Sequence, residues 1–274
     1  MIREALSASV DALRAAGVTE PRLDAELLLA EATGRGRADL AAHPEAEIAP
    51  PAARRFGEMV RRRLRREPVA YILGHRGFRH LELAVDPRVL IPRPETELLV
   101  ELALELGPAR VLDLGTGSGA IALAIAAELP GCEVTAVDTS AAALEVARAN
   151  AERLGLAGRV ELVGTMPRRE HGDFDLIVAN LPYVSEVEWP TLAPEVTDWE
   201  PREALLAGPD GLDVLRVAIP AVAGLTPVLA LEVGVGQDAA VGALLIESGF
   251  AAVESRPDLA GIPRIVIGRR GASA

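Results

Sequence analysis

In the N-terminal part of the chain, apolar residues recur at the spacing of a helix. The residues that define the first helical face are Ile2, Leu6, Val10 and Leu13. A second helical segment follows Pro21, and a third covers 52–66. Glycines at 34 and 36 and a proline-bounded stretch at 44–51 separate these segments. The pattern predicts a small α-helical domain over roughly residues 2–66.

From residue 109 onward the pattern changes to short apolar runs that alternate with segments of helical period. Such runs are typical of strands that a parallel sheet buries on both faces. The expected strands are 111–114, 134–137, 160–163, 176–179, 228–233, 251–253 and 264–267. Because they alternate with helices, they predict an α/β fold with a seven-stranded, mostly parallel sheet covered on both faces.

Two further apolar runs lie between these regions. Residues 81–85 and 88–91 flank Asp86 and Pro87, and this arrangement predicts a β-hairpin that turns at Asp86-Pro87. The chain is therefore expected to have three parts. They are a helical N-terminal domain over 1–74, a β-hairpin linker over 75–92 and an α/β domain over 93–274.

Charge and composition exclude several classes of protein. The net charge of −12 and the pI of about 4.9 give little long-range attraction to nucleic acid phosphates. No apolar run reaches the length of a membrane span, and residues 1–4 lack the pattern of a signal peptide. The single cysteine, Cys132, suits a reducing compartment. We expect a cytoplasmic protein without a membrane or direct nucleic acid partner.

One helical segment departs from the acidic balance. The arginines of 52–66 are Arg54, Arg55, Arg61, Arg62, Arg63, Arg65 and Arg66. A charge run of this kind is usually a solvated face. The alternative is a local docking surface for an acidic or RNA-associated partner.

Residue types that commonly bind metals are sparse. The histidines are His43, His75, His80 and His171. None of them stands at ligand spacing from another histidine or from Cys132, so we expect no metal site.

A glycine-rich stretch, Gly115-Thr116-Gly117-Ser118-Gly119, follows the first buried strand and opens a helix. Without side chains, the backbone at these positions is free to turn tightly and to approach a ligand. Asp138 ends the next strand, where an acid accepts hydrogen bonds from ribose hydroxyls. The stretch has neither the full dinucleotide pattern nor the Lys-Ser or Lys-Thr of a P-loop. Together these features favour a nucleoside-containing cofactor over a plain turn with a solvated acid.

The strand 176–179 ends in Asn180-Leu181-Pro182-Tyr183, which suits a loop at the carboxyl edge of the sheet. Asn180 offers a side-chain carbonyl, Leu181 a backbone carbonyl and Tyr183 a flat face. Two acceptors beside a flat face suit a planar –NH2 group of an amide or a base. The alternative is that Asn180 caps a turn and Tyr183 packs in the core.

The segments 113–119 and 136–138 resemble the first two motifs of S-adenosylmethionine-dependent methyltransferases. The resemblance implies a Rossmann-like methyltransferase domain with S-adenosylmethionine as cofactor. The glycine stretch would surround its methionine and ribose portions, and Asp138 would hold the ribose. Asn180–Tyr183 resembles the Asn-Pro-Pro-Tyr loop of enzymes that methylate planar nitrogens, with Leu181 in place of the first proline. Leucine still supplies the backbone carbonyl, so the change affects the rigidity of the loop more than its chemistry.

Further segments narrow the resemblance. They are 67–74, 91–97, 201–205, 208–212 and 232–237. With these the chain resembles, over nearly its whole length, the glutamine methyltransferases of peptide chain release factors (the PrmC or HemK family). The resemblance implies methyl transfer to the glutamine amide of the Gly-Gly-Gln loop in a class 1 release factor, which is the expected protein partner. It also implies a monomer in which Met166 packs near the adenine and Asn180 lies at the cofactor.

The same resemblance suggests roles for the site residues. Asn180 Oδ1 and the Leu181 carbonyl would each accept one amide N–H, and Pro182 and Tyr183 would exclude water. Glu95, Thr96 and Glu97 either help close the cofactor pocket or cap the helix that follows them.

Two other functions compete. The Asn-Leu-Pro-Tyr spelling also resembles ribosomal RNA dimethyladenosine transferases, so an RNA or DNA adenine methyltransferase is the main alternative. The acidic balance and the 3% of aromatic residues count against a flipped base. A protein that binds the cofactor without catalysis is the second alternative, and the intact glycine stretch, Asp138 and Asn180 count against it.

Overall fold

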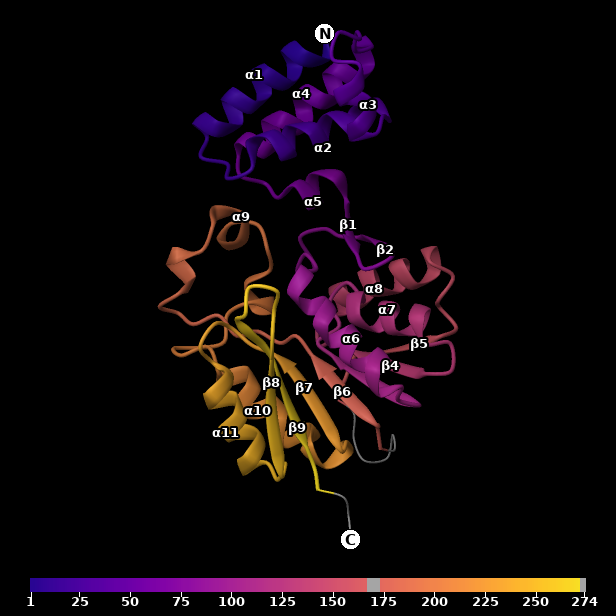
Figure 1. Cartoon of the computed structure of the whole chain (residues 1–274), viewed down its shortest axis with the longest axis vertical. Coiled ribbons are helices and arrows are strands. Elements are labelled where there is room, and N and C mark those ends of the chain that lie inside the picture. The colour runs from indigo at the N-terminus through magenta and orange to yellow at the C-terminus, as the bar shows by residue number, and fades with distance from the viewer. Residues whose placement is uncertain (167–172, 272–274) are drawn as a thin grey trace. The chain divides into compact units, whose positions relative to one another are not determined.

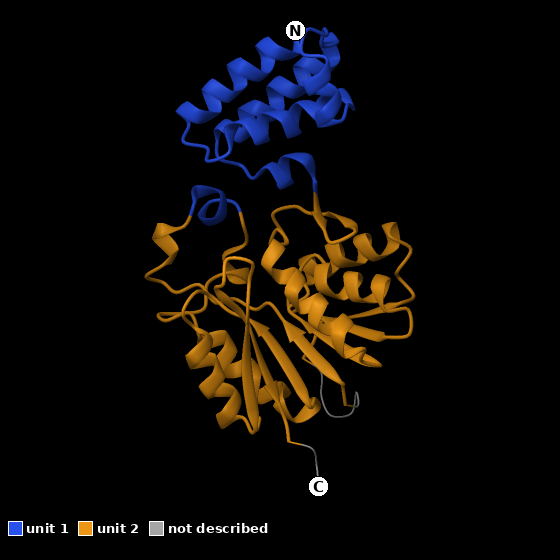
Figure 2. Ribbon diagram, viewed as in Figure 1, with its two compact units in different colours: residues 1–75, 193–199 blue, residues 76–192, 200–274 orange. Residues whose placement is uncertain are grey.

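The computed structural model of the chain describes residues 1–166 and 173–271. It divides into two compact units (Figure 2). The first unit comprises Met1–His75 and Ala193–Trp199, and the second comprises Arg76–Leu192 and Glu200–Ala274. The sequence pattern did not indicate that 193–199 would join the helical part. The division at residues 74 and 92 remains a prediction, because compactness alone does not show which parts fold independently.

The first unit consists of helices packed around a small apolar core. The helices are α1 (Ile2–Ala15), α2 (Pro21–Thr33), α3 (Arg37–Ala42), α4 (Pro50–Leu64), α5 (Val69–Leu73) and α9 (Pro194–Thr197). Leu28 and Leu29 of α2 pack in one cluster with Phe56 and Met59 of α4. Gly34 ends α2 in the left-handed region at φ 67°, which a glycine adopts without strain. Thus the helices expected from the apolar spacing are present, and α9 is added to them.

Arginines of α4 and of the turn after it bind carboxylates within this unit. The nearly buried Arg63 donates to Asp24 of α2 at 2.7 Å and to Glu195 of α9 at 2.6 Å. Arg66 donates to the other carboxylate oxygen of Glu195 at 2.6 Å. Arg62 also pairs with Glu67. Hence part of the basic segment is committed to internal ion pairs, and these pairs hold α9 against the helices.

The second unit is built on a seven-stranded sheet. The strands are β3 (Arg110–Leu114), β4 (Glu133–Val137), β5 (Val160–Val163), β6 (Leu176–Ala179), β7 (Val228–Glu232), β8 (Ala252–Pro257) and β9 (Pro263–Arg269). They lie in the order β5-β4-β3-β6-β7-β9-β8. The first five run parallel to one another, whereas β9 runs antiparallel to both β7 and β8. The expected mostly parallel α/β sheet is confirmed.

Helices cover both faces of this sheet (Figure 1). They are α6 (Glu97–Leu106), α7 (Ala120–Glu128), α8 (Ala141–Arg153), α10 (Asp213–Val222) and α11 (Asp238–Glu247). Side chains alternate between the faces along each strand. Val111 packs in the cluster that includes α6 and α7, and its neighbour Leu112 packs in the cluster of α10 and α11. Short 3-10 helices cover Pro94–Thr96, Trp189–Thr191, Arg202–Ala204 and Ala223–Leu225.

The predicted hairpin is wrong in its turn and in one of its strands. The two-stranded sheet pairs β1 (His75–Phe78) with β2 (Leu81–Ala84), so the chain turns at Arg79 and His80. Arg79 adopts a positive φ of 50°, which is uncommon for a residue other than glycine and which no turn signal in the sequence indicated. Asp86 does make a turn, since the Val89 N–H donates to its carbonyl at 3.1 Å, but residues 88–91 form no strand.

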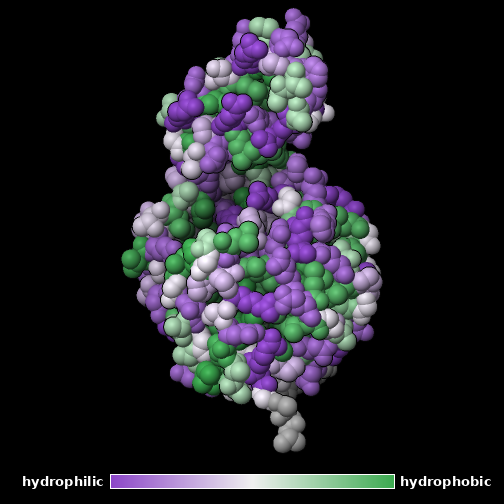
Figure 3. All heavy atoms as spheres, in the orientation of Figure 1, coloured by the Kyte–Doolittle hydropathy of each residue, from purple (hydrophilic) through white to green (hydrophobic). Residues whose placement is uncertain are grey.

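On the face shown in Figure 3, hydrophilic residues lie among the apolar ones on each unit, as on ordinary protein surfaces. Several large apolar side chains are exposed, and they belong to separate segments of the chain: Val187, Val217, Val235, Ile246 and Leu259. Within the described ranges, no helix has both the length and the apolar character that crossing a membrane requires.

Candidate functional site

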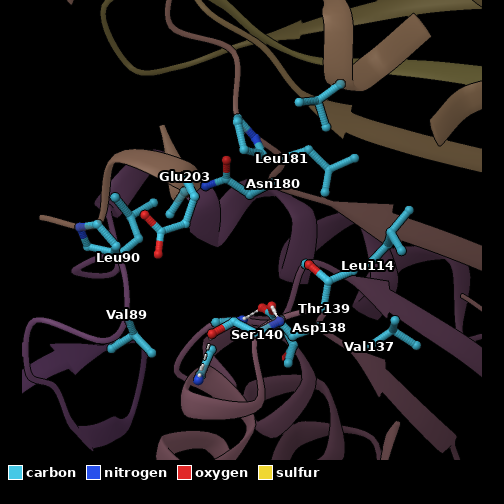
Figure 4. A pocket seen from close by; sticks show the side chains of 18 of the residues that line it. Val89, Leu90, Leu114, Val137, Asp138, Thr139, Ser140, Asn180, Leu181 and Glu203 are labelled. Carbon is cyan, nitrogen blue, oxygen red and sulfur yellow. Dashed lines mark hydrogen bonds between the residues drawn. The ribbon is translucent and has the colours of Figure 1, made fainter. Parts of the chain in front are cut away.

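The loops that follow β3, β4 and β6 border one cavity of about 650 Å³ in the second unit. Parallel strands bring their carboxyl ends to one edge of the sheet, which explains why these loops meet. Figure 4 shows Asp138, Thr139 and Ser140 on one side of this space and Asn180 and Leu181 on another. Of the residues expected to form the site, the lining includes Gly115, Thr116, Gly117, Ser118, Asp138, Met166, Asn180, Leu181 and Pro182.

The glycine stretch turns back over the end of β4. The N–H groups of Gly115 and Thr116 both donate to the Val137 carbonyl, at 2.8 and 2.9 Å. Gly119 lies behind the cavity lining, at the start of α7, with φ 85°. A Cβ atom there would lie 2.9 Å from Leu123 Cδ1, so Gly119 shapes the loop through close packing and not through the cavity.

Asp138 has both carboxylate oxygens at the cavity. Its Oδ2 accepts from the Gly117 N–H at 2.9 Å, and its Oδ1 accepts from the Ser140 N–H at 2.8 Å. A carboxylate offers about four acceptor sites, so each oxygen keeps a lone pair for a ligand hydroxyl. Asp138 therefore joins the glycine loop to the loop after β4 and retains capacity for a ribose.

Asp113, at the end of β3, is a buried acid behind the glycine stretch. Its Oδ2 accepts from Thr116 Oγ1 at 2.6 Å and from the Ala122 N–H at 3.2 Å. Its Oδ1 has no hydrogen-bond partner among the described residues. Burial, with a smaller contribution from the nearby charge of Asp138, raises the pKa of Asp113 to about 7.

A fully buried asparagine supports the same loop and was not expected from the sequence. Asn150 Nδ2 donates to the Ser118 carbonyl at 2.9 Å and to the Ala84 carbonyl at 3.0 Å, and its Oδ1 accepts from the Ala84 N–H. The side chain thereby links β2 to the glycine stretch. A polar residue on the inner face of the helix 141–153 was the only signal in the sequence.

Asn180 follows directly on the fully buried strand β6. Its Nδ2 donates to Thr96 Oγ1 at 3.0 Å, and its Oδ1 accepts no hydrogen bond from the described residues. A bond to a residue 84 positions away is not a local turn cap, so that alternative does not describe Asn180. The structure thus leaves the side-chain carbonyl of a cavity-lining residue without a protein donor.

Tyr183 lies behind the cavity lining, so its ring does not border the cavity as was expected from the sequence. Its hydroxyl donates to Glu232 Oε1 at 3.2 Å, and burial next to this carboxyl raises the pKa of the phenol. Its carbonyl accepts from Gln237 Nε2 at 2.9 Å. Gly211 packs against the same carbonyl so closely that a Cβ atom there would lie 2.2 Å from the oxygen. The segments around 211 and 234–237 therefore fix the backbone of Asn180–Tyr183.

The segment before α6 borders the cavity through Arg93 and Thr96. The buried carboxylate of Glu200 accepts from the Ile91 N–H at 3.0 Å and pairs with Arg93. Thr96 is nearly inaccessible and donates to Glu232 at 2.6 Å, so it does more than begin a helix. From the sequence, Thr96 was given a candidate role and Glu232 was included only as part of the segment 232–237, whereas Glu200 was not named.

Residues 167–172 lie outside the described ranges, and this affects the expectations for Met166 and for metal binding. Met166 is half-buried and lines the cavity, whereas residues 167–172, with His171, lie outside the described residues. Across 1–166 and 173–271, no group of three or more His, Cys, Asp and Glu residues is placed to hold a metal ion. The absence of a metal site remains a prediction.

In the comparison with known proteins, one family model matches the N-terminal part of the chain and another matches residues after it. Residues 4–74 match the family model described as PrmC N-terminal domain, and residues 94–195 match Methyltransferase small domain. A release factor glutamine methyltransferase from Moorella thermoacetica is 44% identical over 286 residues, covering 98% of each chain. One from Koribacter versatilis is 40% identical over 278 residues, covering 99% of each.

Solved structures agree on the fold. The catalytic domain of human METTL16 with an RNA hairpin of the MAT2A 3′UTR superposes with a TM-score of 0.58 at 16% identity. The match covers 70% of this chain and 76% of that one. At this identity the similarity establishes the methyltransferase fold alone. Since the curated relatives match over nearly their whole length, the chain belongs to the release factor glutamine methyltransferase family.

Proposed function

We propose that this protein transfers a methyl group from S-adenosylmethionine to a glutamine side-chain amide nitrogen in class 1 peptide chain release factors. The acceptor is the glutamine of the Gly-Gly-Gln motif. The observation that carries the proposal is the free Oδ1 of Asn180 on a cavity that Asp138 and the glycine stretch also line. The relatives of matching length are named for this activity.

The residues that line the cavity suit S-adenosylmethionine. Asp138 keeps lone pairs for the ribose hydroxyls, Gly115 to Ser118 border the space for the methionine portion, and Met166 offers an apolar contact for the adenine. The N-terminal domain of human METTL16, which has the same fold, was solved in complex with SAH. When bound, the cofactor supplies an electrophilic methyl group on its sulfonium.

An amide nitrogen is a poor nucleophile because its lone pair is delocalised into the carbonyl, so the protein must position it. Asn180 Oδ1 and the Leu181 carbonyl each accept one N–H of the substrate amide. This fixes the amide plane, turns the nitrogen toward the methyl group and favours the positive charge that develops on nitrogen. Pro182 borders the cavity and excludes water, while Tyr183 supports the loop from behind. Once the nitrogen carries the methyl group, one N–H proton passes to solvent, and S-adenosylhomocysteine is the other product.

The proposal includes a monomer that acts in the cytoplasm on a protein partner. The single cysteine, buried Cys132, suits a reducing compartment. The RNA in the METTL16 structure is a partner of that protein, and the net charge of −12 does not favour a nucleic acid here. Light scattering during gel filtration tests the monomer.

The deciding experiment is mass spectrometry of a purified class 1 release factor after incubation with this protein and S-adenosylmethionine. We expect one added methyl group on the Gly-Gly-Gln peptide and none on a release factor whose Gly-Gly-Gln glutamine is replaced by alanine. Parallel incubations with RNA and with DNA test the adenine alternative. Methyl transfer to nucleic acid alone would overturn the proposal.

A further inference from the structure

A buried acid at the end of β7 has no part in the mechanism above. Glu232 is 2% exposed, which is a costly environment for a carboxylate unless its oxygens are hydrogen-bonded. Its Oε2 accepts from Thr96 Oγ1 at 2.6 Å, and its Oε1 accepts from the Tyr183 hydroxyl at 3.2 Å. Both donors belong to segments that adjoin the cavity, so the acid is held by the site and not by the core alone.

Burial raises the pKa of Glu232, while the hydrogen bonds from Thr96 and Tyr183 act in the opposite sense. With Glu232 ionised, the hydrogen bonds in this group have a definite direction. A hydroxyl has one proton, and Thr96 gives it to the carboxylate of Glu232. Thr96 Oγ1 is therefore an acceptor toward Asn180, 3.0 Å away. An acceptor at this point selects the NH2 end of the Asn180 amide and leaves the carbonyl end, Oδ1, for the substrate.

Without such a selection the amide has no fixed orientation. The terminal torsion of asparagine is broad and roughly two-fold, so a half-turn exchanges the NH2 group and the oxygen at little intrinsic cost. A flipped Asn180 would present N–H groups to the N–H groups of a substrate amide. The only side-chain bond of Asn180 to the described residues is the one to Thr96, so this bond determines which end faces the substrate.

We propose that Thr96 and Glu232 are positioning residues that orient the Asn180 amide so that Oδ1 accepts a substrate N–H. This rests on the proposed function, since it assigns Asn180 Oδ1 to the substrate amide. Glu232 accepts the hydroxyl proton of Thr96, and Thr96 in turn orients the amide of Asn180. Tyr183 donates to the same carboxylate. One acid thereby orders both ends of the Asn180–Tyr183 loop.

Three substitutions in the whole chain separate orientation from packing. Thr96→Val keeps the shape and removes the acceptor, whereas Thr96→Ser keeps the hydroxyl. Glu232→Gln keeps the shape but introduces an amide that donates to Thr96. The threonine proton is then free to point at Asn180, which favours the flipped orientation of the Asn180 amide. The matched control is Thr226→Val, because Thr226 is equally buried and its hydroxyl bonds only to Val228 among the described residues.

The readouts are kcat on the release factor and the dissociation constant of S-adenosylhomocysteine by calorimetry. In metal sites, removing an outer partner that orients a ligand typically costs about 10- to 100-fold, and we take this range for the residues that orient Asn180. We expect Thr96→Val and Glu232→Gln to lose kcat in this range, with the dissociation constant changed by less than about threefold. Thr96→Ser should restore kcat, and Thr226→Val should match the wild type.

A double-mutant cycle with Asn180→Ala completes the test. If Thr96 acts through Asn180, adding Thr96→Val to Asn180→Ala causes no further loss of kcat. A Thr96→Val protein with wild-type kcat, or an additive double mutant, overturns the positioning role. A wild-type protein that does not methylate the release factor at all would instead overturn the proposed function, so the two failures are distinguishable.

Discussion

Gly115 and Leu181 approach so closely that a Cβ atom on Gly115 would lie 2.8 Å from Leu181 Cδ2. The loop after β3 and the loop after β6 are therefore packed directly against each other at the cavity. Leu181 is 8% exposed, and it stands where the related motif has a proline. Its side chain packs against Gly115. Under the proposed function its backbone carbonyl also accepts a substrate N–H, so the leucine would contribute to the site in two ways.

Gly115→Ala should disturb this packing. Gly115 has φ 80°, where an alanine is strained by about 1–3 kcal/mol, and the added methyl group would displace Leu181. We expect S-adenosylmethionine to bind at least about tenfold more weakly, with turnover reduced as well. Calorimetry measures the affinity. Gly131→Ala is the matched control, since Gly131 has no positive φ and no atom within 4 Å of the added carbon. Wild-type affinity in Gly115→Ala would show that the close contact is unimportant.

Asn180→Ala should separate cofactor binding from catalysis. The substitution removes an acceptor for the substrate amide and leaves Asp138 and the glycine stretch in place. Removing one preorganised hydrogen-bonding group from an active site costs about 10²- to 10³-fold in kcat. We expect a loss of this size, measured by labelled-methyl transfer, with cofactor affinity close to that of the wild type. Turnover at the wild-type rate would exclude Asn180 from the reaction.

The parts of the site that the sequence predicted are those with local patterns. A buried apolar run, a glycine stretch and an acid after the next strand lie in order along the chain, and β3, β4 and their loops follow from it. The structure brings Asp138 and Asn180 to one cavity because parallel strands share an edge.

The parts that the sequence did not predict depend on contacts between distant residues. Thr96 and Glu232 are 136 positions apart, and no pattern along the chain pairs them. The signals for Glu232 were its place after the buried apolar run 228–231 and in the segment 232–237, and neither points to Thr96. Likewise, 193–199 joins the helical unit through Glu195 of the short helix α9, and no pattern along the chain pairs this acid with Arg63. The turn at Arg79 has no glycine or asparagine to mark it.

Asp113 should make stability depend on pH. Its pKa is about 7 in the native state because of burial, against an ordinary value of 3.8. Between about pH 4 and pH 7 the native state binds a proton that the unfolded chain has lost. This contribution to stability is complete below the ordinary pKa and is lost as pH rises, by at most about 1.4 kcal/mol per pH unit.

The comparison that isolates Asp113 is Asp113→Asn. An asparagine has the same shape and does not titrate, so its cost from unpaired hydrogen bonds is constant across the range. In urea unfolding, the free energy of unfolding of the wild type should fall relative to that of Asp113→Asn as pH rises from 4 to 7. A difference that is flat over this range would show that Asp113 titrates near its ordinary pKa.

Glu195→Ala should destabilise the first unit. Burial alone raises the pKa of Glu195, but hydrogen bonds from Arg66 and Arg63 outweigh it and hold the pKa below its ordinary value. The Arg63 and Glu195 side chains are 6% and 17% exposed, so the loss should lie between the roughly 1 kcal/mol of a surface pair and the roughly 3 kcal/mol of a broken buried one.

The matched control is Asp11→Ala, which breaks an ion pair whose two side chains are 64% and 70% exposed and should cost less than about 0.5 kcal/mol. Hydrogen exchange gives a second readout, because only Glu195→Ala should increase exchange in 193–199. Arg63 would still bind Asp24 at 2.7 Å in that variant, so α4 should remain protected. If exchange in 193–199 were unchanged, the short helix α9 would be held by the backbone on either side of it, and the two arginines would serve only to neutralise a carboxylate.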